Sequence, residues 1–314
     1  MKMENLIGVQ QNNGEILGKF LYFSLSNVLI ERHKMQDICD ALRFPYTESN
    51  RTSMTDAFRS ATGDIYERLV TKDGIFKVYC RDNRRTDKQI ISRELVKETL
   101  GEDTNRYRKL ANINYDKESN RFESLNINYD SDVDIQSHCD KAEELFELYK
   151  QCLSRGQIET VIEGYIRSMN SLKISINGKL FFVPKSDMHK VELLEDLIDA
   201  LNRHNLHNTS ITINSMYVVD DMKQRSKMAD EFYANVRKEI EQYYDKIDML
   251  IKSGSESRAI MDRWVNKISA LEAKKRTYEE VLKRELYDLD DDFAQLKFLS
   301  QELQLRTRKL KRCA

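Results

Sequence analysis

Residues that interrupt regular secondary structure are scarce in this sequence. Its 314 residues include two prolines and ten glycines, and from Asp221 to Arg312 there is one glycine, Gly254, and no proline. Helix interiors tolerate proline and glycine least. Their scarcity excludes a low-complexity linker and leaves the last third of the chain free to form long helices.

Long apolar runs, an excess of one charge and paired cysteines are missing as well. No apolar run approaches the roughly 20 residues that cross a bilayer, and residues 1–18 carry no signal-peptide pattern, so we expect a cytoplasmic protein without a membrane partner. Fifty-one Lys and Arg balance 52 Asp and Glu, so net charge predicts no nucleic-acid partner. The five scattered cysteines lack a CxxC pair, which predicts unpaired thiols in a reducing compartment.

What the sequence does contain predicts an α+β fold. Residues are 40% hydrophobic and 33% charged, which is typical of an ordered protein with a large solvated surface. Apolar, aromatic-rich segments at 20–30, 173–183 and 209–219 predict strands, and segments with helical spacing separate them. We expect these strands to share one mixed sheet with helices packed on it.

A second group of strands is predicted within residues 64–128. Two strand-like segments flank Asp73 and Gly74, a dipeptide that favours a tight hairpin turn, and a further hairpin is predicted around residues 116–120. We interpret 64–128 as an antiparallel meander inserted in a body of residues 1–220. Residues 221–314 then form a long α-helical tail.

The tail resembles a coiled coil because its apolar residues recur at spacings of three and four. A break at residues 253–255 predicts one helix of about 30 residues and a second of up to about 55, folded as a hairpin. About 25 residues of the second helix then lack an intrachain partner. Either the acidic cluster at 288–292 turns that helix back, or it pairs with another chain. We favour oligomerisation, and the predicted interface with a second copy or another protein comprises Phe232, Ile240, Tyr243, Ile247, Trp264, Ile268, Leu271, Tyr278, Leu282, Leu289, Phe293 and Leu296.

Fragments of catalytic and metal-binding motifs fail their spacing tests. The segment 14–19 has too few residues between its glycines for a phosphate loop and precedes a strand. The alternating aspartates at 130–134 lack the glycine and the final carboxylate of a calcium loop. His204 and His207 lack the further ligands of a zinc site. We therefore expect no metal, no cofactor and no catalytic residues.

Clustered basic residues offer an alternative function. Such clusters neutralise phosphates, although strand ends and helix C-termini carry them for other reasons. Stacking aromatics should interleave with the basic residues of a single-strand binder, and only Tyr79 and Tyr107 lie near in sequence. The predicted phosphate contacts are Arg81, Arg84, Arg85, Arg306, Arg308, Lys309, Lys311 and Arg312.

Four segments carry a resemblance to known sequences: LYFSLSNVLI, TDAFRSATGDIYERLV, VYCRDNRRT and KLFFVPKSDM. Together they resemble an uncharacterised family of phage- and plasmid-borne proteins of Firmicutes, over most of residues 16–205. The family supplies no activity, cofactor or catalytic residue. The resemblance implies a setting in which mobile-element proteins bind host or element machinery, such as immune complexes and accessory ATPases.

The leading hypothesis is a non-catalytic, oligomerising, protein-binding factor of a mobile element that inhibits a host defence complex or serves an ATPase. The alternative is a nucleic-acid-binding accessory in phage or plasmid DNA processing. An enzyme whose active-site residues are dispersed along the chain is a third.

Overall fold

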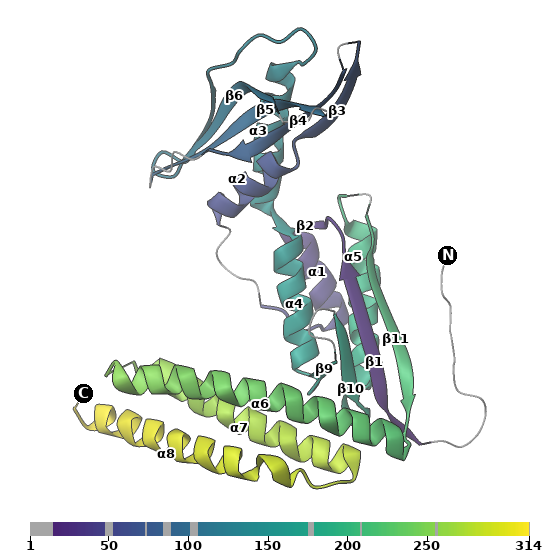
Figure 1. Cartoon of the computed structure of the whole chain (residues 1–314), viewed down its shortest axis with the longest axis vertical. Helices are drawn as coiled ribbons and strands as arrows, with labels where there is room; N and C mark the ends of the chain where they lie inside the picture. The colour runs from purple at the N-terminus through teal and green to yellow at the C-terminus, as the bar shows by residue number, and fades with distance from the viewer. Residues whose placement is uncertain are drawn as a thin grey trace. The chain divides into compact units, whose positions relative to one another are not determined.

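The computed structural model describes residues 15–47, 53–72, 74–83, 89–100, 106–174, 179–207, 209–254 and 257–313, with side chains as far as Arg306 (Figure 1). Contacts divide the chain into two units. The bundle unit comprises residues 1–25, 160–199 and 211–314, and the meander unit comprises 26–159 and 200–210. The helical tail therefore shares a unit with two earlier segments. Whether the predicted domains 1–220 and 221–314 fold independently stays a prediction.

The fold is α+β, as predicted, but every strand pair among the described residues is antiparallel. The prediction of a mixed sheet is therefore wrong, because the strands of the body pair directly with neighbours that run the opposite way. The predicted strand 20–30 is divided into β1 (Ile16–Leu25) and β2 (Leu29–Glu31); β2 pairs with β8 (Cys152–Ser154) in the meander unit.

The sheet of the bundle unit is built around β1. Its strand order is β11-β1-β10-β9, with β9 at Leu172–Lys173, β10 at Leu180–Pro184 and β11 at Ile211–Val219. A side chain at Gly18 would place its Cβ 2.2 Å from the Val183 carbonyl oxygen, so glycine permits β1 and β10 to approach closely. Apart from the elements of the meander, α1 (Arg32–Leu42), α4 (Arg155–Arg167), η1 (Lys185–Asp187) and α5 (His189–His204) also precede the tail.

The tail forms α6 (Met222–Lys252), α7 (Arg258–Leu282), η2 (Tyr287–Leu289) and α8 (Asp290–Cys313). The prediction of one helix of up to about 55 residues after the break is wrong. Lys283 adopts the left-handed conformation that ends helices, with φ of 51°. Three aspartates in the first turn of α8 then favour a new helix N-terminus. The acidic cluster thus marks a reversal of direction, which was the alternative to an unpaired overhang.

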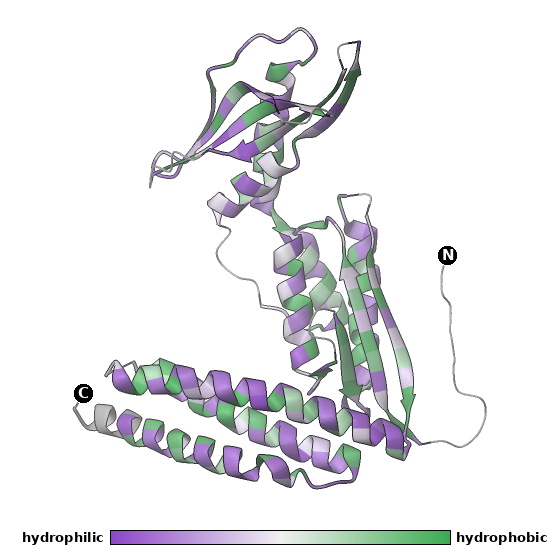
Figure 2. Cartoon of the chain, viewed as in Figure 1, coloured by the Kyte–Doolittle hydropathy of each residue, from purple (hydrophilic) through white to green (hydrophobic). Residues whose placement is uncertain are grey.

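Apolar stripes of α6, α7 and α8 meet in one core, and apolar and polar residues alternate along these helices in Figure 2. The rings of Phe232 and Tyr278 lie 4.5 Å apart between centroids. The Tyr278 hydroxyl, fully buried, donates a hydrogen bond of 2.9 Å to the Asn170 carbonyl oxygen. Burial raises the pKa of Tyr278 well above its usual value. This hydrogen bond joins α7 to the chain before β9.

The meander unit contains the predicted antiparallel meander, which we call the meander sheet. Its strands are β3 (Tyr66–Thr71), β4 (Gly74–Asp82), β5 (Ile90–Leu100), β6 (Tyr107–Asp116) and β7 (Arg121–Leu125), paired in sequence order. Thr71 lies opposite Gly74, which confirms the first hairpin; Asp73 lies outside the described residues. Helices α2 (Met54–Gly63) and α3 (Ile135–Gln151) cover one face, where the rings of Phe58 and Phe146 contact Tyr115 of β6.

Candidate protein-binding surface

The twelve residues predicted as an interface lie inside the bundle unit. Ten of them are buried, and the side chains of Tyr243 and Trp264 are partly buried against the same core. Tyr243 and Trp264 contact each other edge-to-face, with centroids 5.3 Å apart. The stripe therefore needs no second chain to shield it from water. The reason for choosing these residues as an oligomer interface is removed, because α8 folds back and covers them.

A different apolar stripe lies on the outer side of α8. The inner side of this helix carries Leu296 and Leu303, which are 0% and 1% exposed. Phe298 and Leu305 are 68% and 56% exposed. Residues two apart on a helix point about 200° apart, so the second pair lies opposite the first. Phe298 and Leu305 are seven residues apart and share one face, which we call the outer stripe.

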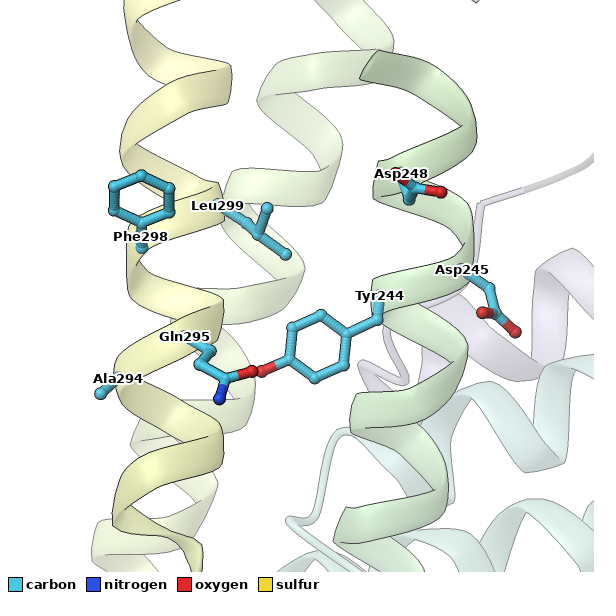
Figure 3. A pocket seen from close by; sticks show the side chains of 7 residues that line it. All are labelled: Tyr244, Asp245, Asp248, Ala294, Gln295, Phe298 and Leu299. Carbon is cyan, nitrogen blue, oxygen red and sulfur yellow. The ribbon is translucent and has the colours of Figure 1, made fainter. Parts of the chain in front are cut away.

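A groove adjoins the outer stripe between α6 and α8 (Figure 3). In Figure 3 the Tyr244 ring projects from α6 towards α8, and Phe298 and Leu299 project from α8. The Tyr244 hydroxyl donates a hydrogen bond of 2.9 Å to the Asp292 carbonyl oxygen, which fixes the first turn of α8 against α6. Burial, and then the Asp292 carboxylate, raise the pKa of Tyr244. The groove has a volume of about 690 Å³ and is lined by Tyr244, Asp245, Asp248, Ala294, Gln295, Phe298 and Leu299.

Charge is distributed unevenly along α8. Its first turn contains Asp290, Asp291 and Asp292, whereas its last eight residues contain five basic residues in the sequence. The Lys275 ammonium, on α7, lies 2.7 Å from the Asp290 carboxylate. Asp291 remains exposed. The helix is thus acidic at its start and basic at its end, with the outer stripe between.

Of the predicted phosphate contacts, Arg81 belongs to the meander unit and Arg306 to the bundle unit. The Arg81 guanidinium lies 2.7 Å from the Glu94 carboxylate, on the meander sheet. The guanidinium of Arg306, in the bundle unit, donates to the Ile251 carbonyl oxygen and to the Glu302 carboxylate. Arg84 and Arg85 lie outside the described residues, as do the side chains of Arg308, Lys309, Lys311 and Arg312.

The aspartates considered for calcium have structural partners. Asp134 caps α3 by accepting a hydrogen bond of 3.1 Å from the Ser137 amide. Asp130 and Asp132 accept hydrogen bonds of 3.0 and 2.7 Å from the Lys97 ammonium. Over the residues that the structure describes, no group of three or more His, Cys, Asp or Glu could hold a metal ion. In the same residues no helix has the length and apolar character to cross a membrane.

A family model matches residues 16–309 of the chain. The chain belongs to DUF6744, a family of unknown function. No curated protein and no solved structure matches it. Membership of DUF6744 covers nearly the whole described chain, both units included, and assigns no activity to either.

Sequence reasoning missed the outer stripe because it followed a single seam of apolar residues along the tail and left Phe298 and Leu305 out of account. A signal was present: Phe298 and Leu305 lie two residues after Leu296 and Leu303, which puts them on the opposite side of the same helix. Two apolar stripes on opposite sides indicate a helix with two contacts. One stripe packs in the bundle core, and the other is open.

Proposed function

We propose that this protein is a non-catalytic binding factor that self-associates through the outer stripe of α8. The observation that supports the proposal is the exposure of Phe298 at 68%, beside the apolar floor of the groove. An exposed phenylalanine that adjoins further apolar surface is a common anchor of protein interfaces.

The arrangement of charge favours a second copy of α8 as the occupant. Two copies packed antiparallel about the midpoint of the outer stripe set Phe298 of one against Leu305 of the other. The same register sets position 291 against position 312, an aspartate against an arginine. A two-fold interface of this kind is self-complementary, since each contact occurs twice. A parallel pairing would bring the acidic starts together.

Light scattering of the full chain at low and high concentration tests self-association. We expect a mass near twice 37.1 kDa at high concentration. Phe298→Glu should lower it to the single-chain mass, because two buried carboxylates would replace two buried rings. Met222→Glu, at an apolar residue of α6 that is 86% exposed, is the matched control and should leave the mass unchanged. A single-chain mass for the wild type at both concentrations would contradict the proposal.

The partner class is a further part of the proposal and rests on the resemblance to phage- and plasmid-borne proteins. We propose that the self-associated protein binds a host defence complex or an accessory ATPase in the cytoplasm. Purified candidates can be titrated against the wild type and Phe298→Glu. If a candidate binds the wild type tightly and Phe298→Glu weakly, the result supports binding by the self-associated protein. If both proteins bind the candidate equally, recognition of the partner does not depend on self-association.

A further inference from the structure

The open face of the meander sheet collects three tyrosines from separate strands. Side chains alternate between the two faces of a strand, and residues opposite each other share a face. Tyr66 lies opposite Tyr79, and Tyr107 lies opposite Glu98. Val78 and Cys80 point instead to the covered face, where they belong to the core beneath α2 and α3. The three rings therefore lie on the face that these helices leave open.

These rings are available to a ligand. Tyr66 is 58% exposed and Tyr107 is 53% exposed, while Tyr79, between them, is partly buried. Val96 lies opposite Tyr79 in the register and is fully buried, so it forms an apolar floor beneath the rings. A tyrosine ring with an exposed face offers a base a surface on which to stack.

Cationic side chains interleave with the rings. The Lys77 ammonium lies 4.4 Å from the centroid of the Tyr79 ring and 5.8 Å from that of Tyr66. The Arg81 guanidinium lies 3.7 Å from the centroid of the Tyr107 ring. Two further cations share the face: Arg68 opposite Lys77, and Lys109 opposite Val96.

Two carboxylates on this face are already engaged. Glu94 accepts hydrogen bonds from Arg81 at 2.7 Å and from Lys109 at 3.1 Å. Burial raises the pKa of Glu94, but these hydrogen bonds outweigh it and the pKa lies below its usual value. Glu98 accepts a hydrogen bond from the Tyr79 hydroxyl, and this contact, after burial, raises the pKa of that tyrosine. Four cationic side chains and two carboxylates therefore surround the rings, so the net charge of this face around the rings is positive.

We infer that the open face of the meander sheet binds single-stranded nucleic acid, with bases stacked on Tyr66, Tyr79 and Tyr107 and phosphates near Arg68, Lys77 and Lys109. Stacking and charge alternate across the strands, as a sequence-tolerant binder requires. A duplex keeps its bases stacked on one another, so the rings favour single strands. This site is separate from the outer stripe and does not depend on self-association.

Fluorescence anisotropy of a labelled thirty-nucleotide oligothymidylate, titrated with the full chain, tests the inference. Tyr66→Ala and Tyr107→Ala should each weaken binding about tenfold, since one stacking surface is lost in each. Tyr129→Ala is the matched control: this tyrosine is 83% exposed on the chain beyond β7 and should bind as the wild type does. Thermal unfolding of each variant verifies that the meander unit is intact.

Two further measurements distinguish binding by base stacking from binding by charge alone. Contact of Arg68, Lys77 and Lys109 with about three phosphates predicts an affinity loss of about 20-fold between about 50 and 200 mM salt. Lys77→Gln should reduce this salt dependence. A duplex of matched length should bind more weakly than the single strand. No binding at low salt would overturn the inference, and so would tyrosine variants that bind like the wild type. Because Phe298→Glu leaves this face intact, it should bind the oligonucleotide normally, which keeps the two proposals distinguishable.

Discussion

The bundle unit and the meander unit leave different kinds of surface open to water. The bundle unit exposes an apolar stripe, Phe298 and Leu305, on a helix whose ends carry opposite charge. The meander unit exposes a sheet face on which tyrosines alternate with lysine and arginine side chains. A self-complementary apolar stripe suits a second copy of a helix, whereas rings among cations suit an anionic polymer. The two proposals thus assign self-association to the bundle unit and nucleic-acid binding to the meander unit.

The interiors of the bundle unit and the meander unit differ as well. The bundle core is formed by the apolar stripes of α6, α7 and α8, with Ser300 as a buried polar residue of α8. The meander unit encloses an ionic cluster in which the Lys97 side chain, 8% exposed, lies between Asp130, 4% exposed, and Asp132. Loss of an apolar side chain leaves a cavity, while loss of one ion leaves its partner buried and unpaired. Substitutions in the two interiors should therefore respond differently to pH.

The largest effect is expected in the bundle core. Phe232→Ala should lower the free energy of unfolding by about 3–5 kcal/mol, because a fully buried ring is removed from contact with Tyr278. Urea unfolding at pH 7 measures this. Phe298→Ala is the matched control on the outer stripe and should change the free energy of a dilute sample by less than about 0.5 kcal/mol. Equal losses for both variants would show that Phe298 is buried in the fold as Phe232 is, and would contradict an open outer stripe.

Next in size is the ionic cluster of the meander unit. Lys97→Met should lower the free energy of unfolding by about 3 kcal/mol at pH 7, because the Asp130 carboxylate stays buried without its main partner. In the wild type, hydrogen bonds from the Asp132 amide and Lys97 outweigh burial and hold the pKa of Asp130 below its usual value. Its stabilising contribution is therefore lost as pH falls.

The stability that Lys97→Met loses at pH 7 should be partly regained, relative to the wild type, as pH falls. Without Lys97, the buried Asp130 carboxylate keeps only the exposed Arg108 guanidinium, 3.4 Å away, and the Asp132 amide as partners. Protonation then removes a poorly compensated charge, so the difference between variant and wild type should shrink below about pH 4. Lys252→Met removes an exposed ammonium 2.7 Å from Asp248 and should leave stability unchanged. A difference that stays constant from pH 7 to pH 3 would contradict this account of Asp130.

The smallest effect is expected at the start of the bundle helices. The Arg225 guanidinium, followed by the Lys283 ammonium, lowers the pKa of Asp220 to about 2. A carboxyl group with a lowered pKa stabilises the fold above its unfolded value near 3.8, and the stabilisation is lost as pH falls towards about 2. Asp220→Asn should cost on the order of 1 kcal/mol at pH 7, because solvent around Lys283 screens part of the interaction. Unfolding curves of the two proteins should converge near pH 2.

Local patterns in the sequence were sufficient for several elements. Asp221 caps α6 by accepting a hydrogen bond from the Gln224 amide, and the helix ends at the predicted break after Lys252. Gly74 opens β4 after the predicted turn. In each case the information lies in a few adjacent residues, since a cap or a hairpin turn is a short-range structure. The α+β class follows from the same short-range periodicities.

The reversal between α7 and α8 was harder to predict. Lys283 in a left-handed conformation carries no sequence signal, because glycine and asparagine are the residues expected there. The helix period continues through this point, so the sequence supports one long helix as well as two. Packing of Leu286 and Leu289 in the core accompanies the reversal. For this reason the residues predicted as an interface are covered within the chain itself.

By itself the sequence determined the elements that neighbouring residues can define: the length of the first tail helix, the meander and the existence of an apolar helical stripe. Only the tertiary structure decided which stripe is buried and which residues of the meander sheet share a face. Helical spacing places residues on a face from their local order, whereas Tyr66, Tyr79 and Tyr107 meet through strand register. Register depends on contacts between residues far apart in the chain, and these form only when the whole sheet packs against its helices.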